Sequence, residues 1–327
     1  MLAYVIRRIL VMIPTLLVAS ALIFAIIRLP PADFVTTLVA TAAQSGSSSD
    51  QASMEALRHQ YGLDQPLYVQ YGRWIGGLVH GDLGYSFEWQ RSVGPLISAQ
   101  LVYTIILSLM SMVFMWVVAL PIGIYSATHQ YSILDNVLTF IGFLGLSIPD
   151  FMLGLVYLFI TAFYFHQPVG GLFSPAMENA PWSIAKAVDL FNHMIWPTVI
   201  LGIGGTAQLI RIMRGNLLDI LGQQFITTAR AKGLREDKVI NKYAVRVAIN
   251  PLISVMGMQI PSLISGATIL GIVLSIPTIG PLLLRALVDV DMYLAGSILL
   301  FAVALLMVGN LLADICLAWV DPRIRYQ

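Results

Sequence analysis

Six stretches of this chain are apolar over lengths suited to crossing a lipid bilayer. A helix needs roughly 20 mostly apolar residues to cross about 30 Å of hydrocarbon, because each residue advances it by about 1.5 Å. The stretches occupy residues 9–27, 101–125, 137–165, 195–210, 252–276 and 296–319. The sequence therefore predicts an all-α fold, a polytopic membrane bundle of six transmembrane helices.

Composition narrows the possible functions. Hydrophobic residues make up 58% of the chain and charged residues only 11%, whereas about a quarter of an ordinary soluble protein is charged. The single cysteine, Cys316, cannot form an intramolecular disulfide. The sequence holds neither a Walker A motif nor His-Glu-x-x-His. No basic face recurs outside one central loop, which argues against nucleic-acid binding.

That central loop, residues 211–250, is a basic island between two apolar spans. It holds eight of the eighteen Lys and Arg residues, namely Arg211, Arg214, Arg230, Lys232, Arg235, Lys238, Lys242 and Arg246. Only Asp219, Glu236 and Asp237 oppose them. So polar a segment must lie outside the lipid, and its positive charge favours the cytoplasmic side.

The distribution of positive charge predicts the orientation. With the N-terminus inside, two basic residues near each terminus join the eight of the island, which places twelve inside and six outside. Both termini are then cytoplasmic. Residues 1–27 form an N-terminal anchor helix, retained because its apolar core exceeds the usual 7–15 residues of a signal peptide. Residues 28–100 form a large external loop, and residues 101–327 form a five-helix core.

The external loop shows signs of both flexibility and order. Residues 44–50 are rich in Ser and Gly and read as flexible. A short helical pattern at Met54, Leu57 and Tyr61 follows, and then an aromatic run at Tyr68, Tyr71 and Trp74. A structured external cap fits this pattern. A solvated loop with aromatic residues at the membrane interface is the alternative.

The island itself has a helix–Gly–helix pattern. We expect residues 212–221 to extend the fourth span, Gly222 to end that helix, and residues 225–232 to form a second helix with Gly233 as its C-cap. Arg230 and Lys232 suit the negative end of its dipole. A further basic helix over residues 236–246 returns to the fifth span. Helices that end at glycines favour a docking surface, because a loop that only sets the membrane topology needs positive charges but no such helices.

Two acids fall in apolar spans and call for an explanation. Asp150 follows Ser147-Ile148-Pro149 about halfway along the third span, where Pro149 can kink the helix. Asp150 is either a polar contact for cargo or a local hydrogen-bond partner, and both readings stay open. Asp314 lies near the cytoplasmic end of the sixth span, where pairing with Arg323 or Arg325 is a sufficient structural role.

Five ordered motifs give the whole chain a resemblance to a known family. Thr228-Ala229-Arg230-Ala231-Lys232-Gly233-Leu234 resembles the coupling loop of permease subunits in bacterial ABC importers. Four further motifs are similar to the first (B-type) permease subunit of the dipeptide/oligopeptide/nickel group: Tyr61-Gly62-Leu63-Asp64-Gln65-Pro66-Leu67, Gly81-Asp82-Leu83-Gly84-Tyr85-Ser86, Ser147-Ile148-Pro149 and Asp321-Pro322-Arg323-Ile324-Arg325.

The resemblance implies an ABC type I importer permease fold in the bacterial inner membrane, with residues 28–100 periplasmic. Its implied partners are membrane lipid, a second homologous permease, two cytoplasmic ATPases that use ATP and Mg, and a periplasmic substrate-binding protein. The chain itself would be no enzyme and bind no cofactor. ATPase coupling would fall to Phe225, Thr228, Ala229, Arg230, Ala231, Lys232, Gly233 and Leu234. The translocation path would include Pro149, Asp150, Gly271 and Pro277.

The cargo is less constrained. Peptide permeases of this group usually carry a glutamate, a Pro-Gly pair and an arginine where this chain has Gly271, Pro277-Thr278 and Pro281. That departure is closer to members associated with oligosaccharides, so oligopeptide import is the first expectation and oligosaccharide import the second. A proton-coupled secondary transporter, with Asp150 or Asp314 as the relay, is the alternative from another class.

Overall fold

The computed structural model describes residues 2–29, 34–36, 55–56, 58–59, 62–165 and 170–320. The chain forms two compact units. The first is built on Thr104–Pro277 with short pieces from both ends of the chain, and the second on Ile6–Tyr103 with Thr278–Met307. The predicted flexible stretch 44–50, residues 54, 57 and 61, and the motif 321–325 with both proposed partners of Asp314 lie outside the described residues.

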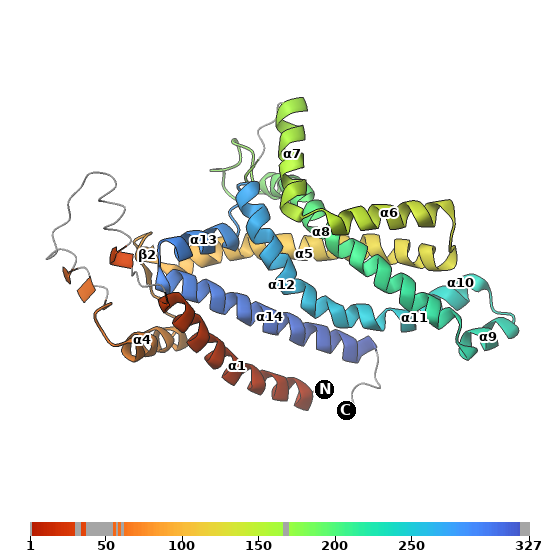
Figure 1. Ribbon diagram of the computed structural model, residues 1–327, viewed down its shortest axis with the longest axis horizontal. Coiled ribbons are helices and arrows are strands. Elements are labelled where there is room, and N and C mark those ends of the chain that lie inside the picture. Colours follow the sequence, from red (N-terminus) through yellow and green to blue (C-terminus); the bar gives the residue numbers. More distant parts are fainter. Residues whose placement is uncertain are drawn as a thin grey trace. The chain divides into compact units, whose positions relative to one another are not determined.

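Long helices occupy the predicted spans (Figure 1). They are α1 (Leu2–Arg28), α5 (Val93–Thr128), α8 (Ile184–Leu221), α12 (Asn250–Val273) and α14 (Met292–Val320). Helix α8 continues for 38 residues, which confirms the expected extension of the fourth span to Leu221. Helix α5 begins at Val93, eight residues before the predicted start of the second span.

Not every predicted span is equally long in the structure. Four described helices are long and apolar enough to cross a membrane: Val5–Arg28, Val93–Thr128, Ile184–Leu221 and Met292–Leu312. A bent helix pair in the third predicted span brings the number to five if the pair counts as one crossing. The described apolar part of α12, Ser262–Val273, is shorter than a span. The crossing at α12 therefore stays a prediction.

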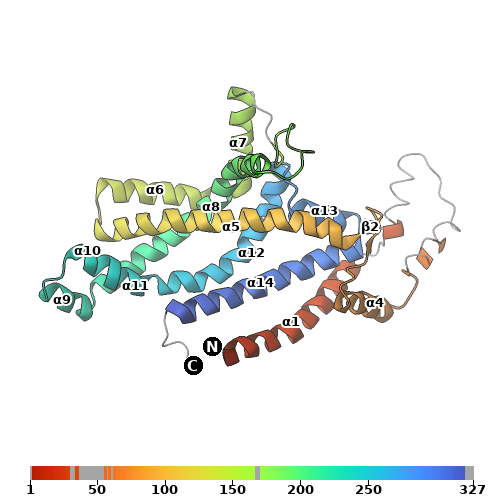
Figure 2. The ribbon, with the colours of Figure 1, turned by 180° about the vertical axis from the view of Figure 1, so that it is seen from behind.

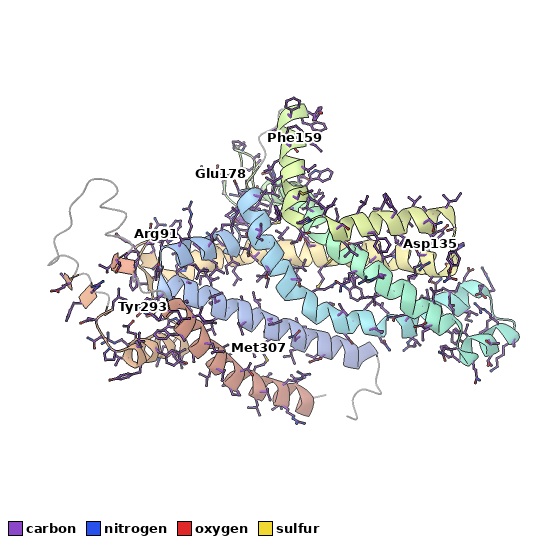
Figure 3. All side chains as sticks on the ribbon, viewed as in Figure 1. Arg91, Asp135, Phe159, Glu178, Tyr293 and Met307 are labelled. Atoms are coloured by element: carbon purple, nitrogen blue, oxygen red, sulfur yellow. The ribbon has the colours of Figure 1, made fainter. Side chains whose placement is uncertain are left out.

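The third span is not the single helix predicted over residues 137–165. Helix α6 (Ile133–Ser147) and helix α7 (Asp150–Tyr164) meet at 99°. The proline ring disfavours helical geometry at the preceding residue, and Ile148 is extended at φ −99° and ψ 122°. Figure 3 shows α7 leaving the line of α6, with Phe159 on it. The kink expected at Pro149 is thus a complete break.

In the first unit, glycines on α8 let neighbouring helices approach closely. A Cβ added to Gly202 would lie 2.6 Å from Phe114 of α5, and one added to Gly205 would lie 2.1 Å from the sulfur of Met115. On α6, a Cβ at Gly145 would lie 2.6 Å from Ile203. The small residues of the fourth span therefore serve close helix packing.

A buried ion pair joins α6 to α8 in the same unit. Asp135 is 1% exposed, and its carboxylate accepts hydrogen bonds from Nη2 of Arg214 and from the Tyr131 N–H, both at 3.0 Å. Ser132 caps α6 by accepting the Asp135 N–H at 3.1 Å. One of the island's eight basic side chains is therefore committed to holding these helices together.

The second unit has its own hydrophobic core. Helix α4 (Leu67–Val79) carries the predicted aromatic run, and its Trp74 is 2% exposed. The ring of Phe24 on α1 packs 5.4 Å from Tyr71 and 6.3 Å from Trp74, centroid to centroid. A short apolar helix missed by the sequence analysis, α13 (Ile279–Val288), contributes Ile279, Leu282 and Ala286. The described part of residues 62–92 is therefore folded onto a hydrophobic core.

A buried aspartate also organises this unit. Asp291 is 0% exposed, and its carboxylate accepts hydrogen bonds from the Ser86 hydroxyl at 2.5 Å, the Phe87 N–H at 3.0 Å and the Leu294 N–H at 3.2 Å. It thus binds the small hairpin of β1 (Tyr85–Ser86) and β2 (Arg91–Ser92) to the start of α14. Burial raises the pKa of Asp291, and these hydrogen bonds offset part of the rise.

The glycine packing of α8 is testable with two matched substitutions. Gly202→Ala should destabilise the protein by about 1–3 kcal/mol, because its methyl group meets Phe114 in a filled interface. Gly215→Ala, on the same helix with nothing within 4 Å of the new Cβ, should be neutral or stabilising by about 0.5–1 kcal/mol. Thermal unfolding of the detergent-purified variants measures both, and equal midpoints would contradict the packing role.

Candidate functional site

The island begins where α8 ends, and its first element is the short helix α9 (Gln224–Ala231). Gly222 is the C-cap of α8, as predicted. At the other end, Gly233 has φ +73°, a conformation that glycine adopts without a Cβ penalty. The Gly233 N–H donates to the Arg230 carbonyl at 2.9 Å, and the Leu234 N–H donates to the Ala229 carbonyl at 3.4 Å. These two bonds form a Schellman motif, which gives α9 a defined end.

Helix α9 lies at one end of α8, together with α10 (Glu236–Lys238) (Figure 2). It is amphipathic in its packing. Ile226 is 0% and Ala229 6% exposed, while Phe225 is 44% exposed. Thr228, Arg230 and Lys232 are also exposed. One face thus fixes α9 to the rest of the island, and the opposite face presents an aromatic ring, a hydroxyl and cations.

An ion pair reinforces the end of α9. Arg230 Nη2 donates to Glu236 Oε1 at 2.6 Å, and Arg230 Nε lies 3.2 Å from both carboxylate oxygens. The hydrogen bond from Arg230 lowers the pKa of Glu236, and the same bond raises the pKa of Arg230. The sequence analysis assigned Arg230 to the helix dipole and missed Glu236 as its direct partner. Their separation of six residues across a glycine turn gave no helical spacing to detect it.

Only some of the island's basic side chains form ion pairs within the described residues. Besides Arg214 and Arg230, Arg235 pairs with Asp237 at 3.0 Å. The other five basic side chains form no ion pair within the described residues: Arg211, Lys232, Lys238, Lys242 and Arg246. All five are exposed. The surface of the island therefore keeps a net positive charge available to a partner.

The segment after α9 is not the single basic α-helix predicted over residues 236–246. Helix α10 passes into the π-helix η1 (Val239–Ala244) and then into α11 (Val245–Ala248). A π-helix bonds i to i+5, so residues five apart can share a face. Val239 and Ala244 are both 0% exposed. The wider turn thus keeps both apolar side chains buried, which a regular α-helix would not do.

The island connects two long helices. Helix α8 leads into α9 through Gly222, and α11 leads into α12 through Ile249. The Asn216 side-chain amide of α8 donates to the Ala248 carbonyl of α11 at 3.4 Å. A displacement of α9 would therefore act on α8 and α12 together.

Of the four residues predicted for the translocation path, only Asp150 lines the cavity between α7, α8 and α12. Asp150 is the first residue of α7, and Pro149 is its N-cap. Asp150 lines a cavity with residues of α8 and α12, whereas Pro149, Gly271 and Pro277 do not. Gly271 instead accepts the Ile276 N–H at 2.8 Å, which closes the end of α12 with Ser275 at φ +53°. Pro277 is exposed just beyond it.

The sequence analysis missed the residues that share this cavity with Asp150. Gln208 comes from α8, and Gln259 and Ser262 come from α12. The helical spacing of these residues could be seen in the sequence, because Gly204 and Gln208 are four residues apart and so lie on one face of a helix. The same holds for Gln259 and Leu263.

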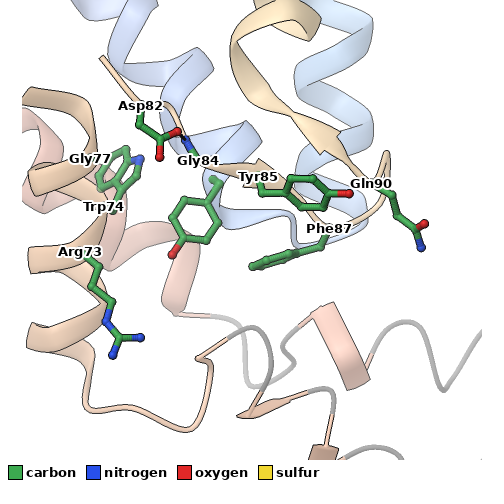
Figure 4. A pocket seen from close by; sticks show the side chains of 9 residues that line it. Arg73, Trp74, Gly77, Asp82, Gly84, Tyr85, Phe87 and Gln90 are labelled. Atoms are coloured by element: carbon green, nitrogen blue, oxygen red, sulfur yellow. Dashed lines mark hydrogen bonds between the residues drawn. The ribbon is translucent and has the colours of Figure 1, made fainter. Parts of the chain in front are cut away.

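The second unit contains a separate pocket of about 560 Å³ (Figure 4). Aromatic rings from Trp74, Tyr85, Phe87 and Tyr293 line it, with Arg73 and Asp82 beside them. Gly84 has φ +87°, and a Cβ there would lie 2.5 Å from the Tyr293 ring. The external motif that contains Asp82 and Gly84 therefore shapes this pocket.

The whole chain is similar to known transport proteins. Residues 119–326 match the family described as "Binding-protein-dependent transport system inner membrane component", and residues 1–110 match its N-terminal family. The oligopeptide transport system permease protein AppB of Bacillus subtilis is 36% identical over the full length of both chains. The dipeptide permease DppB and the glutathione permease GsiC of Escherichia coli are 31% and 32% identical, again over both full lengths.

A solved structure supports the fold. A chain of the inward-facing MetNI methionine ABC transporter matches 69% of this chain and 96% of its own length, with a TM-score of 0.53 and 19% identity. At that identity the likeness concerns the fold alone. It confirms the predicted fold of an ABC type I importer permease.

The end of α9 is testable through its two flanking glycines. Gly233→Ala should loosen α9, because alanine at positive φ costs on the order of 1 kcal/mol. Gly222→Ala is the matched control, since Gly222 has an ordinary φ of −81°. Hydrogen exchange of the peptide covering residues 224–234 should be faster in the first variant only. Equal exchange in both variants would contradict the role of Gly233.

Proposed function

Because the chain belongs to the family of binding-protein-dependent transport system inner membrane components, we propose that it forms half of an oligopeptide translocation pathway and couples that pathway to ATPase subunits. It is a multi-pass inner membrane permease component of a binding-protein-dependent ABC importer. The proposed complex contains a second, homologous permease, two cytoplasmic ATPases and a periplasmic binding protein. ATP and Mg are used in the ATPases, so this chain contributes no hydrolytic chemistry.

One observation carries the coupling role. The two helices that flank the Asp150 cavity, α8 and α12, are also the two helices that lead into the island. Helix α9 projects from this junction with an exposed face and a capped, ion-paired end. In the proposal, α9 inserts into an ATPase groove, and closure of the ATPases on ATP moves α9 as a rigid body. That motion then changes the separation of the two helices at the cavity.

The orientation follows from the same assignment. A coupling helix must face the cytoplasm, which places the island and both termini on that side, in line with the excess of positive charge there. The folded external cap would then face the periplasm, where the binding protein delivers cargo. A proton-driven secondary transporter would need no such helix and no binding protein, and family membership favours the importer.

Peptides are the proposed cargo. The relatives that span the whole chain are named for oligopeptides, dipeptides and glutathione, all of which contain peptide bonds. The departures at Gly271, Pro277 and Pro281 bear on this less than the sequence suggested. Gly271 and Pro277 lie at the end of α12 and outside the cavity of Asp150.

The docking role of α9 predicts the effect of Phe225→Ala. Aromatic side chains commonly anchor protein interfaces, and truncating such an anchor costs about 2 kcal/mol or more, which is roughly thirtyfold in affinity. Phe225 is 44% exposed, so its removal should leave the permease folded. Val247→Ala is the control, because Val247 is similarly exposed at 41% but lies on α11. The affinity of the permease for the ATPase is measured in detergent. An unchanged affinity in the Phe225 variant would contradict the docking assignment.

The cargo proposal predicts which ligands stabilise the companion binding protein. Ligand at a hundred times its Kd should stabilise that protein by about 2.7 kcal/mol. Short peptides should therefore raise its melting temperature, and oligosaccharides should not. Stabilisation by oligosaccharides alone would overturn the peptide assignment while leaving the importer assignment intact.

A further inference from the structure

The cavity beside Asp150 has the composition of a ligand subsite. It measures about 360 Å³ and is lined by the start of α7, facing sides of α8 and α12, and Met115 of α5. This volume is near the lower end of the range for small-molecule pockets. It suits one end of a peptide rather than a whole oligopeptide.

Among the described residues that line the cavity, Asp150 alone has an ionisable side chain. Within the described residues, its carboxylate has no ion-pair partner. Glycines face it from both sides. A Cβ on Gly204 of α8 would lie 3.8 Å from Oδ1, and one on Gly266 of α12 would lie 3.3 Å from Oδ2. Because glycines have no side chains, α8 and α12 leave room around the Asp150 carboxylate, which has no ion-pair partner within the described residues.

Gln259 provides a second, independent observation. It is 7% exposed, yet within the described part of the chain neither the oxygen nor the nitrogen of its side-chain amide has a hydrogen-bond partner. Leaving a buried polar group unpaired costs on the order of 1–3 kcal/mol. Gln259 lines the same cavity as Asp150, with Gln208 and Ser262 nearby. The cavity thus offers a negative charge together with an unused donor and an unused acceptor.

We propose, on the basis of the peptide-importer function above, that this cavity binds the N-terminal ammonium group and first peptide unit of the cargo. The ammonium group has three N–H donors and matches the carboxylate of Asp150 in charge. The Gln259 amide can donate to the first peptide carbonyl and accept from the following N–H. Such recognition is independent of side chains, as a permease for varied peptides requires.

The main alternative is a structural role for the carboxylate. Asp150 is the first residue of α7, where a negative charge favours the helix dipole. That role does not use Gln259 and needs no cation in the cavity. The two roles differ in a measurable way, because only the binding role makes occupancy of the cavity depend on a free ammonium group in the ligand.

The experiment uses the full importer in lipid vesicles, with this chain carrying Cys316→Ser and Ser262→Cys. Ser262 lines the cavity and is exposed, so a thiol there reports on the cavity. We expect a cationic methanethiosulfonate (2-aminoethyl) to label it at least about tenfold faster than an anionic one (2-sulfonatoethyl), relative to free thiol. Asp150→Asn should abolish this preference. Ser147→Ala should not, because its hydroxyl bonds only to the Phe143 carbonyl, outside the cavity.

Protection of the thiol by peptides then tests whether the cavity binds the ammonium group of the ligand. Trialanine should slow labelling more than N-acetyl-trialanine does, and Asp150→Asn should remove the difference. The proposal is overturned if the thiol is not labelled in any state, if the cation preference survives Asp150→Asn, or if both peptides protect equally. ATP-driven uptake of trialanine, measured in the same vesicles, tests the importer function separately. Normal uptake with equal protection would reject the subsite alone, whereas no uptake of any peptide would reject the peptide cargo.

Discussion

The continuity of α8 is the constraint on which the first unit depends. Over 38 residues a single helix presents glycines to α5 and α6, residues of the cavity to α7 and α12, and its end to the island. Its one internal proline, Pro197, precedes the cavity residues, so the part of α8 from the cavity to Leu221 is free of proline and can transmit a displacement along the helix. The close contacts at Gly202 and Gly205 further limit how α8 can move independently of α5. A displacement of α8 at its Leu221 end would therefore reach the cavity.

The sequence predicted the features that depend on local patterns. Apolar length located the helices, and the glycines at 222 and 233 marked the ends of the elements of the island. Features that depend on distant residues were missed. The ion pair of Asp135 with Arg214 joins residues 79 apart, and Gln259 meets Asp150 only because α7 and α12 converge. The break at Pro149 was underestimated, because a proline within an apolar run kinks some helices and ends others.

The island combines rigidity with accessible charge. Three of its cations are bound within the protein, to Asp135, Glu236 and Asp237, and these contacts hold its shape. The other five extend into solvent. Counting charges in the sequence treated all eight alike, so the count could support a prediction of topology but could not describe a surface. The π-helix also combines buried and exposed side chains. Its wider turn buries Val239 and Ala244, while the lysines around them remain exposed to solvent.

The hydrogen bonds of Asp291 have a consequence for biosynthesis. Ser86 and Asp291 are 205 residues apart, so the hairpin is made long before its acceptor exists. At a synthesis rate of about 5–20 residues per second, that interval lasts roughly 10–40 s. During this time the nascent external segment lacks the carboxylate that later fixes its backbone. Completion of the cap is therefore a late event, and a chain truncated before Asp291 would be left with the hairpin untethered.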